Sequence, residues 1–166
     1  MAVVKYFSDR LIDHLPMVRG QLIENANLAK STWFRVGGPA EVLFRPADKA
    51  DLQTFLEELP LEVSVTILGV GSNTLIRDGG IPGVSIRLGE GFSAIQIDRH
   101  RIEAGSGSPN LKIANAARKG SLTGLEFLCG IPGALGGSIR MNAGAFGGET
   151  GNVVELVNGL SRSGND

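Results

Sequence analysis

Residues 63–75 read V-S-V-T-I-L-G-V-G-S-N-T-L, an apolar run that passes directly into a glycine-rich loop. The β-branched residues at its start predict a buried strand over 63–68. Before it, an apolar stripe at helical spacing predicts a helix over 48–59, and residues 41–45 read as a strand. Strand, helix and strand make a βαβ unit with a right-handed crossover, so the loop 69–75 follows the carboxyl end of a strand, where open α/β sheets bind ligands.

Further elements are predicted on both sides of this unit. The spacing of apolar residues predicts a helical lead over residues 1–28, in which Pro16 ends the pattern. Downstream, the patterns predict a strand over 84–88, a hairpin of strands 94–97 and 101–104, a helix from Pro109 to Gly120 capped by Ser108, and a strand over 153–160.

Glycine marks both the lobe boundary and the segments where function should lie. Gly89 and Gly91 divide an α+β fold into a first lobe, 29–90, and a second lobe, 91–166, behind the helical lead. Glycine makes up 24 of the 166 residues, about twice the usual share, and it gathers in two stretches instead of spreading along a linker.

The first stretch is the loop Gly69-Val70-Gly71-Ser72-Asn73-Thr74-Leu75. Its glycines let backbone N–H groups approach an anion closely, and Ser72, Asn73 and Thr74 add side-chain donors, a combination that suits a pyrophosphate. The alternative is a tight turn with capping residues. A dinucleotide fingerprint needs glycine where Thr74 stands, and no G-x-x-x-x-G-K-[ST] occurs, which disfavours a Rossmann dehydrogenase and a P-loop nucleotidase.

The second stretch contains Gly130-Ile131-Pro132-Gly133, then Gly136-Gly137, then Met141-Asn142-Ala143-Gly144-Ala145-Phe146-Gly147. No charged residue lies between Glu126 and Arg140, and residues this small let the backbone lie flat against a planar ring. Such a surface suits a flavin, and the alternative is a close-packed turn that binds no ligand. On the flavin hypothesis, valine at Gly133 or Gly144 displaces the flavin before it unfolds the chain.

Composition and charge exclude several classes of function. The net charge of −1 leaves no basic excess for nucleic acid or an anionic membrane, and no uncharged apolar run is long enough to span a bilayer. Lys5, Asp9 and Arg10 stand where a signal peptide needs an apolar core. We expect a cytoplasmic protein without a disulfide or a metal site, because one cysteine and two histidines give neither a cysteine pair nor zinc-ligand spacing.

Three reactive or charged side chains adjoin the second stretch. Cys129 has no histidine near it in sequence, so core packing is a better interpretation than a nucleophile or a covalent flavin link. Arg140 could contact a phosphate or the polar edge of a flavin. The alternative is an ordinary surface arginine whose guanidinium is solvated. Glu126 could bind a ribityl or ribose hydroxyl. The alternative is a glutamate at a helix end whose carboxylate is solvated.

Together these motifs resemble the bacterial UDP-N-acetylenolpyruvoylglucosamine reductase family, flavoenzymes of cell-wall synthesis. The resemblance covers residues 28–160, and the motifs that carry it occur in family order and spacing: Thr32-Trp33-Phe34-Arg35-Val36-Gly37-Gly38, Gly69–Asn73, Gly130–Gly133 with Gly136-Gly137, and Met141–Gly147. It implies a two-lobed FAD-binding domain of the vanillyl-alcohol-oxidase-like (PCMH) type, a small βαβ lobe followed by a second mixed α+β lobe.

The resemblance also implies FAD as cofactor, NADPH as co-substrate and a UDP-sugar as substrate. The FAD pyrophosphate would lie on the loop 69–75 and the isoalloxazine against residues 130–147. Arg140 is the one candidate contact with substrate. The implied cofactor-binding residues are Gly69, Val70, Gly71, Ser72, Asn73, Thr74, Leu75, Gly130, Ile131, Pro132, Gly133, Gly136, Gly137, Asn142, Ala143, Gly144 and Ala145.

The family's catalytic groups are not matched in this chain. No Tyr-Arg-x-Ser motif occurs, and the only tyrosine is Tyr6. By resemblance, the catalytic arginine, the serine acid and the glutamate would lie beyond Asp166, so we expect the FAD-binding part of the reductase, catalytically incomplete by itself. Two other interpretations stay open: the flavin domain of a different oxidoreductase of the same superfamily, and a non-enzymatic binding module.

Overall fold

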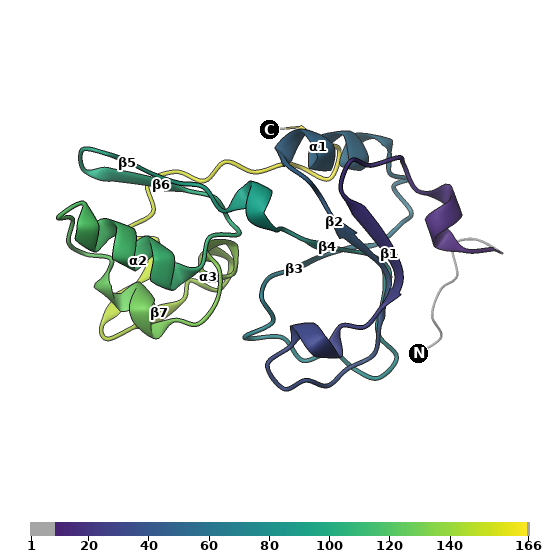
Figure 1. Cartoon of the computed structure of the whole chain (residues 1–166), viewed down its shortest axis with the longest axis horizontal. Coiled ribbons are helices and arrows are strands. Elements are labelled where there is room, and N and C mark those ends of the chain that lie inside the picture. The colour runs from purple at the N-terminus through teal and green to yellow at the C-terminus, as the bar shows by residue number, and fades with distance from the viewer. Residues whose placement is uncertain (1–8, 166) are drawn as a thin grey trace. The chain divides into compact units, whose positions relative to one another are not determined.

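The structure, a computed structural model, describes residues 9–165 and divides into two compact units (Figure 1). The first unit extends to Leu88 and takes in the chain again from Gly159, and the second unit is Gly89–Asn158. Strands and helices occur in both units, so the predicted α+β class is confirmed. Among the described residues no helix is both long enough and apolar enough to cross a membrane.

The polar tail packs on the first unit, although the sequence placed it in the second lobe, 91–166. The Arg162 guanidinium donates hydrogen bonds to the carbonyl oxygens of Pro60, at 2.9 Å, and Val63, at 3.1 Å. These two carbonyls follow the helix of the first unit, so the tail is fixed there by contacts that no local pattern announces.

A four-stranded sheet with one helix forms the first unit (Figure 1). Its elements are β1 (Gln21–Ala26), β2 (Ala40–Arg45), α1 (Lys49–Glu58), β3 (Val65–Leu68) and β4 (Ile81–Arg87). The strand order is β1-β2-β4-β3, in which β1 runs antiparallel to β2, and both β2 and β3 run parallel to β4. The βαβ crossover therefore skips one position, because β4 inserts between the two strands it joins.

The strand β3 is a sheet edge, and the prediction of a buried strand over 63–68 is wrong. Val63 is buried, but it precedes the strand, and Ile67 within the strand is 61% exposed. Among residues 9–165 only β4 pairs with β3, so one side of this strand has no partner strand there. The β-branched composition identified a strand but could not distinguish an edge from a centre.

The helix α1 begins and packs as its sequence predicts. The Asp48 carboxylate accepts from the backbone N–H of Asp51 at 3.0 Å, which caps the first turn. Phe55 faces the sheet and packs on Phe44 with ring centroids 4.3 Å apart. The core cluster around Leu43, to which Leu28, Ala40 and Ile76 belong, contains neither aromatic residue.

The helical lead predicted over residues 1–28 is wrong in its described part. Residues 1–8 lie outside the described residues, Leu11–His14 form a single 3₁₀ turn, and residues 21–26 form strand β1. The strand forms because it pairs along the whole of β2, from Gln21 opposite Arg45 to Ala26 opposite Ala40. This long-range pairing overrides the local spacing of apolar residues.

The second unit contains two helices and two hairpins. Its regular elements are β5 (Ile95–Asp98), β6 (Arg101–Ala104), α2 (Asn110–Lys119), α3 (Leu135–Met141), β7 (Gly144–Ala145) and β8 (Gly148–Glu149), with 3₁₀ turns at Glu90–Phe92, Glu126–Gly130 and Thr150–Asn152. Ile113, Ala114, Phe127 and Leu128 form its buried core. The predicted hairpin is confirmed, with Ile95 opposite Ala104 and Asp98 opposite Arg101.

Two local predictions in this unit need correction. Ser108 does not cap α2, because the helix begins at Asn110 and the buried Ser108 hydroxyl instead donates to the carbonyl oxygen of Ala94 at 3.4 Å. Residues 153–160 form no strand in the described structure. Val153, Val154, Leu156 and Val157 are exposed, 77% for Leu156, and no strand of the described structure pairs with this segment.

Candidate cofactor site

The loop 69–75 leaves the end of β3 and is held against the segment that follows the 3₁₀ turn Ala29–Ser31. Gly71 has φ +74°, and a Cβ there would lie 2.1 Å from the carbonyl oxygen of Ser31. The backbone N–H of Trp33 donates to the Gly71 carbonyl oxygen at 3.2 Å. Glycine is therefore required at position 71 by the fold itself, both for backbone conformation and for close approach.

The outer part of this loop offers hydrogen-bond donors that the described fold does not use. The backbone N–H groups of Val70, Asn73 and Thr74 meet no acceptor within residues 9–165. The Asn73 side chain is exposed, and a Cβ at Gly69 would meet no atom within 4 Å. An anion could approach this backbone without displacing any protein group.

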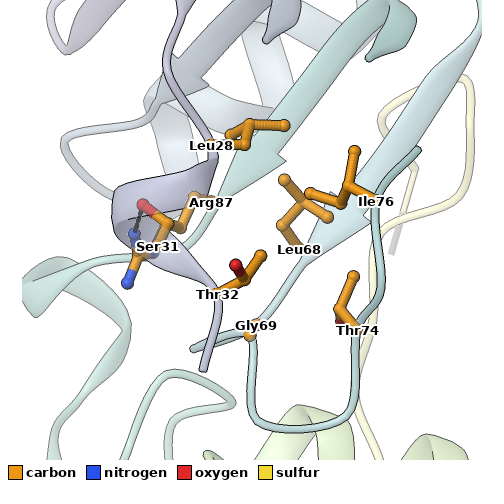
Figure 2. A pocket seen from close by; sticks show the side chains of 9 residues that line it. Leu28, Ser31, Thr32, Leu68, Gly69, Thr74, Ile76 and Arg87 are labelled. Carbon is orange, nitrogen blue, oxygen red and sulfur yellow. Dashed lines mark hydrogen bonds between the residues drawn. The ribbon is translucent and has the colours of Figure 1, made fainter. Parts of the chain in front are cut away.

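A small cavity of about 10 Å³ lies behind the loop. Figure 2 shows Leu28, Leu68 and Ile76 on its apolar side, with Thr74 across from Ser31 and Arg87. One water molecule needs roughly this volume, so a phosphate group does not fit inside. Any diphosphate would contact only the outer surface of the loop and the polar groups at the edge of the cavity.

Arg87 is a polar group near this loop that the sequence reasoning missed. It ends β4, it is half-buried, and its Nη1 donates to the hydroxyl of Ser31 at 2.7 Å (Figure 2). Burial lowers the pKa of its guanidinium, and the positive charge of Arg45 lowers it further. The alternation of Val84 and Ile86 with polar residues predicted only a strand, and no local signal marks the cavity that Arg87 lines.

The second glycine-rich stretch is held by backbone bonds inside the second unit. The buried Asn110 side chain donates to the carbonyl oxygen of Ile131 at 3.1 Å and to the hydroxyl of Ser138 at 2.8 Å. The backbone N–H of Gly136 donates to the carbonyl oxygen of Ser106 at 2.8 Å. Asn110 was absent from the sequence prediction, since a polar residue in the first turn of a helix resembles an ordinary cap.

Several predicted site residues in this stretch serve the fold. Gly133 has φ +142°, and a Cβ at Gly144 would lie 2.8 Å from the carbonyl oxygen of Gly148. Asn142 ends α3 in the left-handed region, and its Oδ1 accepts from the backbone N–H of Gly151 at 2.7 Å. Valine at Gly133 or Gly144 strains the unit itself, so the predicted order, flavin loss before unfolding, is not a sound test.

Gly137 behaves differently from these glycines. It lies within α3, it is exposed, and a Cβ there would meet no atom within 4 Å. Glycine inside a helix costs about 0.5–1 kcal/mol relative to alanine, so a side chain at this position would stabilise the helix. The fold gives no reason for glycine at position 137, and a flat ligand on that face would give one.

The charged and reactive residues nearby lie on the surface. Cys129 is exposed and its thiol donates to the Glu126 carbonyl oxygen at 2.8 Å, so the prediction of core packing is wrong. The Glu126 carboxylate accepts from the Thr123 hydroxyl and from the backbone N–H of Gly124, each at 2.8 Å, and the hydrogen bond from its own backbone N–H, followed by these two, lowers its pKa. Arg140 is exposed near the end of α3. The described residues contain no cluster of three metal-ligating side chains.

Both glycine-rich stretches lie within a region of the chain that matches a known family. A family model described as an FAD binding domain matches residues 40–161. The chain belongs to this family. FAD is therefore the cofactor to test against the two stretches.

Both stretches fit FAD on observations of this structure. The uncovered N–H groups of Val70, Asn73 and Thr74 are the donor set that a diphosphate requires. Gly137 is exposed with nothing near its Cβ position, and no charged side chain lies between Glu126 and Arg140 in sequence, so a neutral ring could approach this part of α3. The two stretches belong to different units, and each provides its part within its own unit.

Relatives of this FAD binding domain confirm the resemblance seen in the sequence. The chain is 55% identical to the UDP-N-acetylenolpyruvoylglucosamine reductase of Azorhizobium caulinodans over 90% of this chain and 49% of that protein. It is 53% identical to the reductase of Parvibaculum lavamentivorans over 93% of this chain and 50% of that protein. The chain thus spans about half the length of the curated relatives it matches.

A solved structure supports the same relationship. The crystal structure of UDP-N-acetylenolpyruvylglucosamine reductase from Thermus caldophilus matches with a TM-score of 0.64 and 33% sequence identity. The match covers 80% of this chain and 46% of that chain. The predicted FAD-binding fold is confirmed at this level of identity.

Proposed function

We propose that this chain is the FAD-binding portion of an NADPH-dependent reductase that converts UDP-N-acetylglucosamine enolpyruvate to UDP-N-acetylmuramate in peptidoglycan synthesis in the cytoplasm. The observation that carries the proposal is the donor-rich backbone of loop 69–75 in a chain 55% identical to a reductase of that name. An FAD-binding domain of a different oxidoreductase is the second candidate, because the family match covers the domain and not the substrate.

The chain's own residues would bind and orient the cofactor. Backbone N–H groups of the loop 69–75 would hold the diphosphate, and Gly130–Gly133, Gly136, Gly137 and residues 142–145 would support the isoalloxazine. When bound, FAD supplies hydride transfer between NADPH and the enolpyruvyl double bond. Asn110 would keep the carbonyl oxygen of Ile131 turned inward, so that the neutral stretch presents a fixed surface.

Arg140 is proposed as the substrate contact that this chain offers. It is exposed, and it is the first charged residue after Glu126 along the neutral stretch. A guanidinium suits a phosphate or carboxylate oxygen of a UDP-sugar. Neither stretch carries a candidate acid for the substrate carbon, so we propose that the proton donor comes from the part of the reductases that this chain does not match.

A chimera tests the substrate assignment. The matching half of the Azorhizobium caulinodans reductase is replaced with this chain, and NADPH oxidation is followed by absorbance with the enolpyruvyl UDP-sugar and without it. Substrate-dependent oxidation near the rate of the parent reductase is the expected result. A chimera that binds FAD, and is reduced by NADPH, but ignores the UDP-sugar would favour the second candidate.

A further inference from the structure

Arg87 occupies the position in the first unit where a ligand-binding side chain is expected. It is the last residue of β4, in register with Leu68, the last residue of β3 before the loop 69–75. Both strands run parallel, and the carboxyl edge of parallel strands is where α/β sheets bind ligands. Arg87, Gly69 and Thr74 line the same small cavity (Figure 2).

The charge of Arg87 has no counter-ion within residues 9–165. Its one described side-chain bond is to the neutral hydroxyl of Ser31, and no described carboxylate forms an ion pair with it. Arg45, in the matching place at the end of β2, adds a like charge. A half-buried cation beside another cation weakens the fold unless an anion joins them.

Arg162 shows what a structural arginine looks like in the same unit. Its guanidinium donates to two backbone carbonyl oxygens, those of Pro60 and Val63, and so fixes the tail. Arg87 joins no such backbone groups, and a guanidinium carries five N–H donors. Most of the donors of Arg87 are therefore left for a partner outside the described chain.

We propose that Arg87, oriented by Ser31, is a side-chain anchor for the diphosphate of FAD, in addition to the backbone donors of the loop 69–75. A planar guanidinium matches phosphate oxygens in a two-bond fork, which a backbone loop alone does not provide. The inference rests on the proposed placement of the diphosphate on this loop. It predicts that the charge lowers the stability of the apo chain and is compensated when FAD binds.

The test compares FAD affinity with apo stability in Arg87→Gln and Arg87→Lys. Affinity is measured by flavin fluorescence titration and apo melting by circular dichroism. We expect Arg87→Gln to bind FAD roughly 10- to 100-fold more weakly, the usual size of a charge-assisted hydrogen bond, with apo melting unchanged or raised. Arg87→Lys should recover part of the affinity, because it keeps the charge without the fork.

The control is Arg118→Gln, an exposed arginine in the last turn of α2, which should change neither readout. Equal FAD affinity in the parent and Arg87→Gln overturns the inference, and so does a joint loss of affinity and apo stability, which marks a structural role. UDP is titrated in parallel, since a loss for UDP alone would assign Arg87 to a substrate diphosphate. A parent chain that binds no FAD overturns the proposed function itself and is checked first.

Discussion

The two glycine-rich stretches have similar compositions but differ in how many hydrogen bonds hold their backbones to the rest of the unit. In the loop 69–75, one bond from Trp33 holds the carbonyl of Gly71 while neighbouring N–H groups stay uncovered. In residues 130–147, Asn110 and residues 106–108 bond two carbonyl and two N–H groups, while the N–H groups of Gly133, Ala134 and Gly137 meet no acceptor within residues 9–165. Both stretches leave N–H donors uncovered, so we propose the first for the anion because it also carries the polar side chains of Asn73 and Thr74, and the second for the neutral ring because no charged residue lies between Glu126 and Arg140.

The same comparison separates glycines needed by the fold from glycines free to serve a ligand. Gly71 and Gly144 would each bring a Cβ within 3 Å of a backbone oxygen. Gly69 and Gly137 would bring it near nothing. Sequence composition treats all four alike, and only the spatial surroundings distinguish them.

The largest expected effect concerns catalysis. The question is whether the two stretches, with FAD bound, are sufficient for turnover. Proton transfer from a positioned acid typically contributes about 10²- to 10⁴-fold to a rate, and neither stretch provides a candidate. We therefore expect turnover by the 166-residue chain with FAD, NADPH and the enolpyruvyl UDP-sugar to be at least about 100-fold below that of the Azorhizobium caulinodans reductase. Nicotinamide absorbance measures it, and a rate near the reference would show that two binding surfaces are enough.

A second test addresses the donor character of the first stretch. Asn73→Asp places a carboxylate beside the proposed diphosphate in place of an amide donor. About 1 kcal/mol of repulsion and a similar loss of hydrogen bonding should together weaken FAD binding roughly 30-fold. Asn115→Asp, the same change on an exposed position of α2, is the matched control. If FAD affinity measured by flavin titration is unchanged in Asn73→Asp, the FAD diphosphate does not bind this loop.

Local signals predicted the parts of the fold that depend on neighbours in sequence. The cap at Asp48, the apolar stripe of α1 and the hairpin of β5 and β6 all appear as expected. The insertion of β4 between β2 and β3 depends on partners far apart in sequence, and nothing in residues 41–68 announces it.

The candidate site shows the same division between local and distant information. The loop 69–75 was found because glycines follow a strand signal, which is a local pattern. Asn110 and Arg87 were missed because their partners, Ile131 and Ser31, lie 21 and 56 residues away. Cys129 was predicted to be buried because free cysteines usually are, but this one is exposed. A tendency of the residue type does not determine the burial of one cysteine.

A third test uses a carboxylate that distinguishes the two units. Asp51 is buried in the first unit and accepts from the backbone N–H groups of Arg19, Gly20 and Ala47 at 2.7–2.9 Å. Burial raises its pKa, but these hydrogen bonds outweigh burial and leave the pKa below the usual value. No other carboxylate is buried among the described residues, so the second unit has no counterpart.

A carboxylate with a lowered pKa stabilises the fold above its unfolded pKa, and this stabilisation is lost as pH falls through the folded value. Asp51→Asn should lower the free energy of unfolding by about 1 kcal/mol at neutral pH. The difference should shrink as pH falls below about 4, near the unfolded pKa of aspartate. As pH falls, hydrogen exchange should show the backbone amides of β1 losing protection before those of α2. A pH-independent difference, or α2 opening first, would contradict the assignment.

The smallest expected effect separates the two kinds of glycine directly. Gly137→Ala adds a methyl group inside α3 where nothing opposes it, so helix propensity should raise apo stability by about 0.5–1 kcal/mol. The same methyl group would stand on the surface proposed for the flavin ring, so FAD affinity should fall while the apo protein becomes more stable. Gly144→Ala is the control, and it should lower apo stability because its Cβ meets the Gly148 carbonyl oxygen at 2.8 Å. Apo melting and flavin titration measure both effects, and a Gly137→Ala chain that is stabilised yet binds FAD as well as the parent would show that the open face of α3 is not the ring surface.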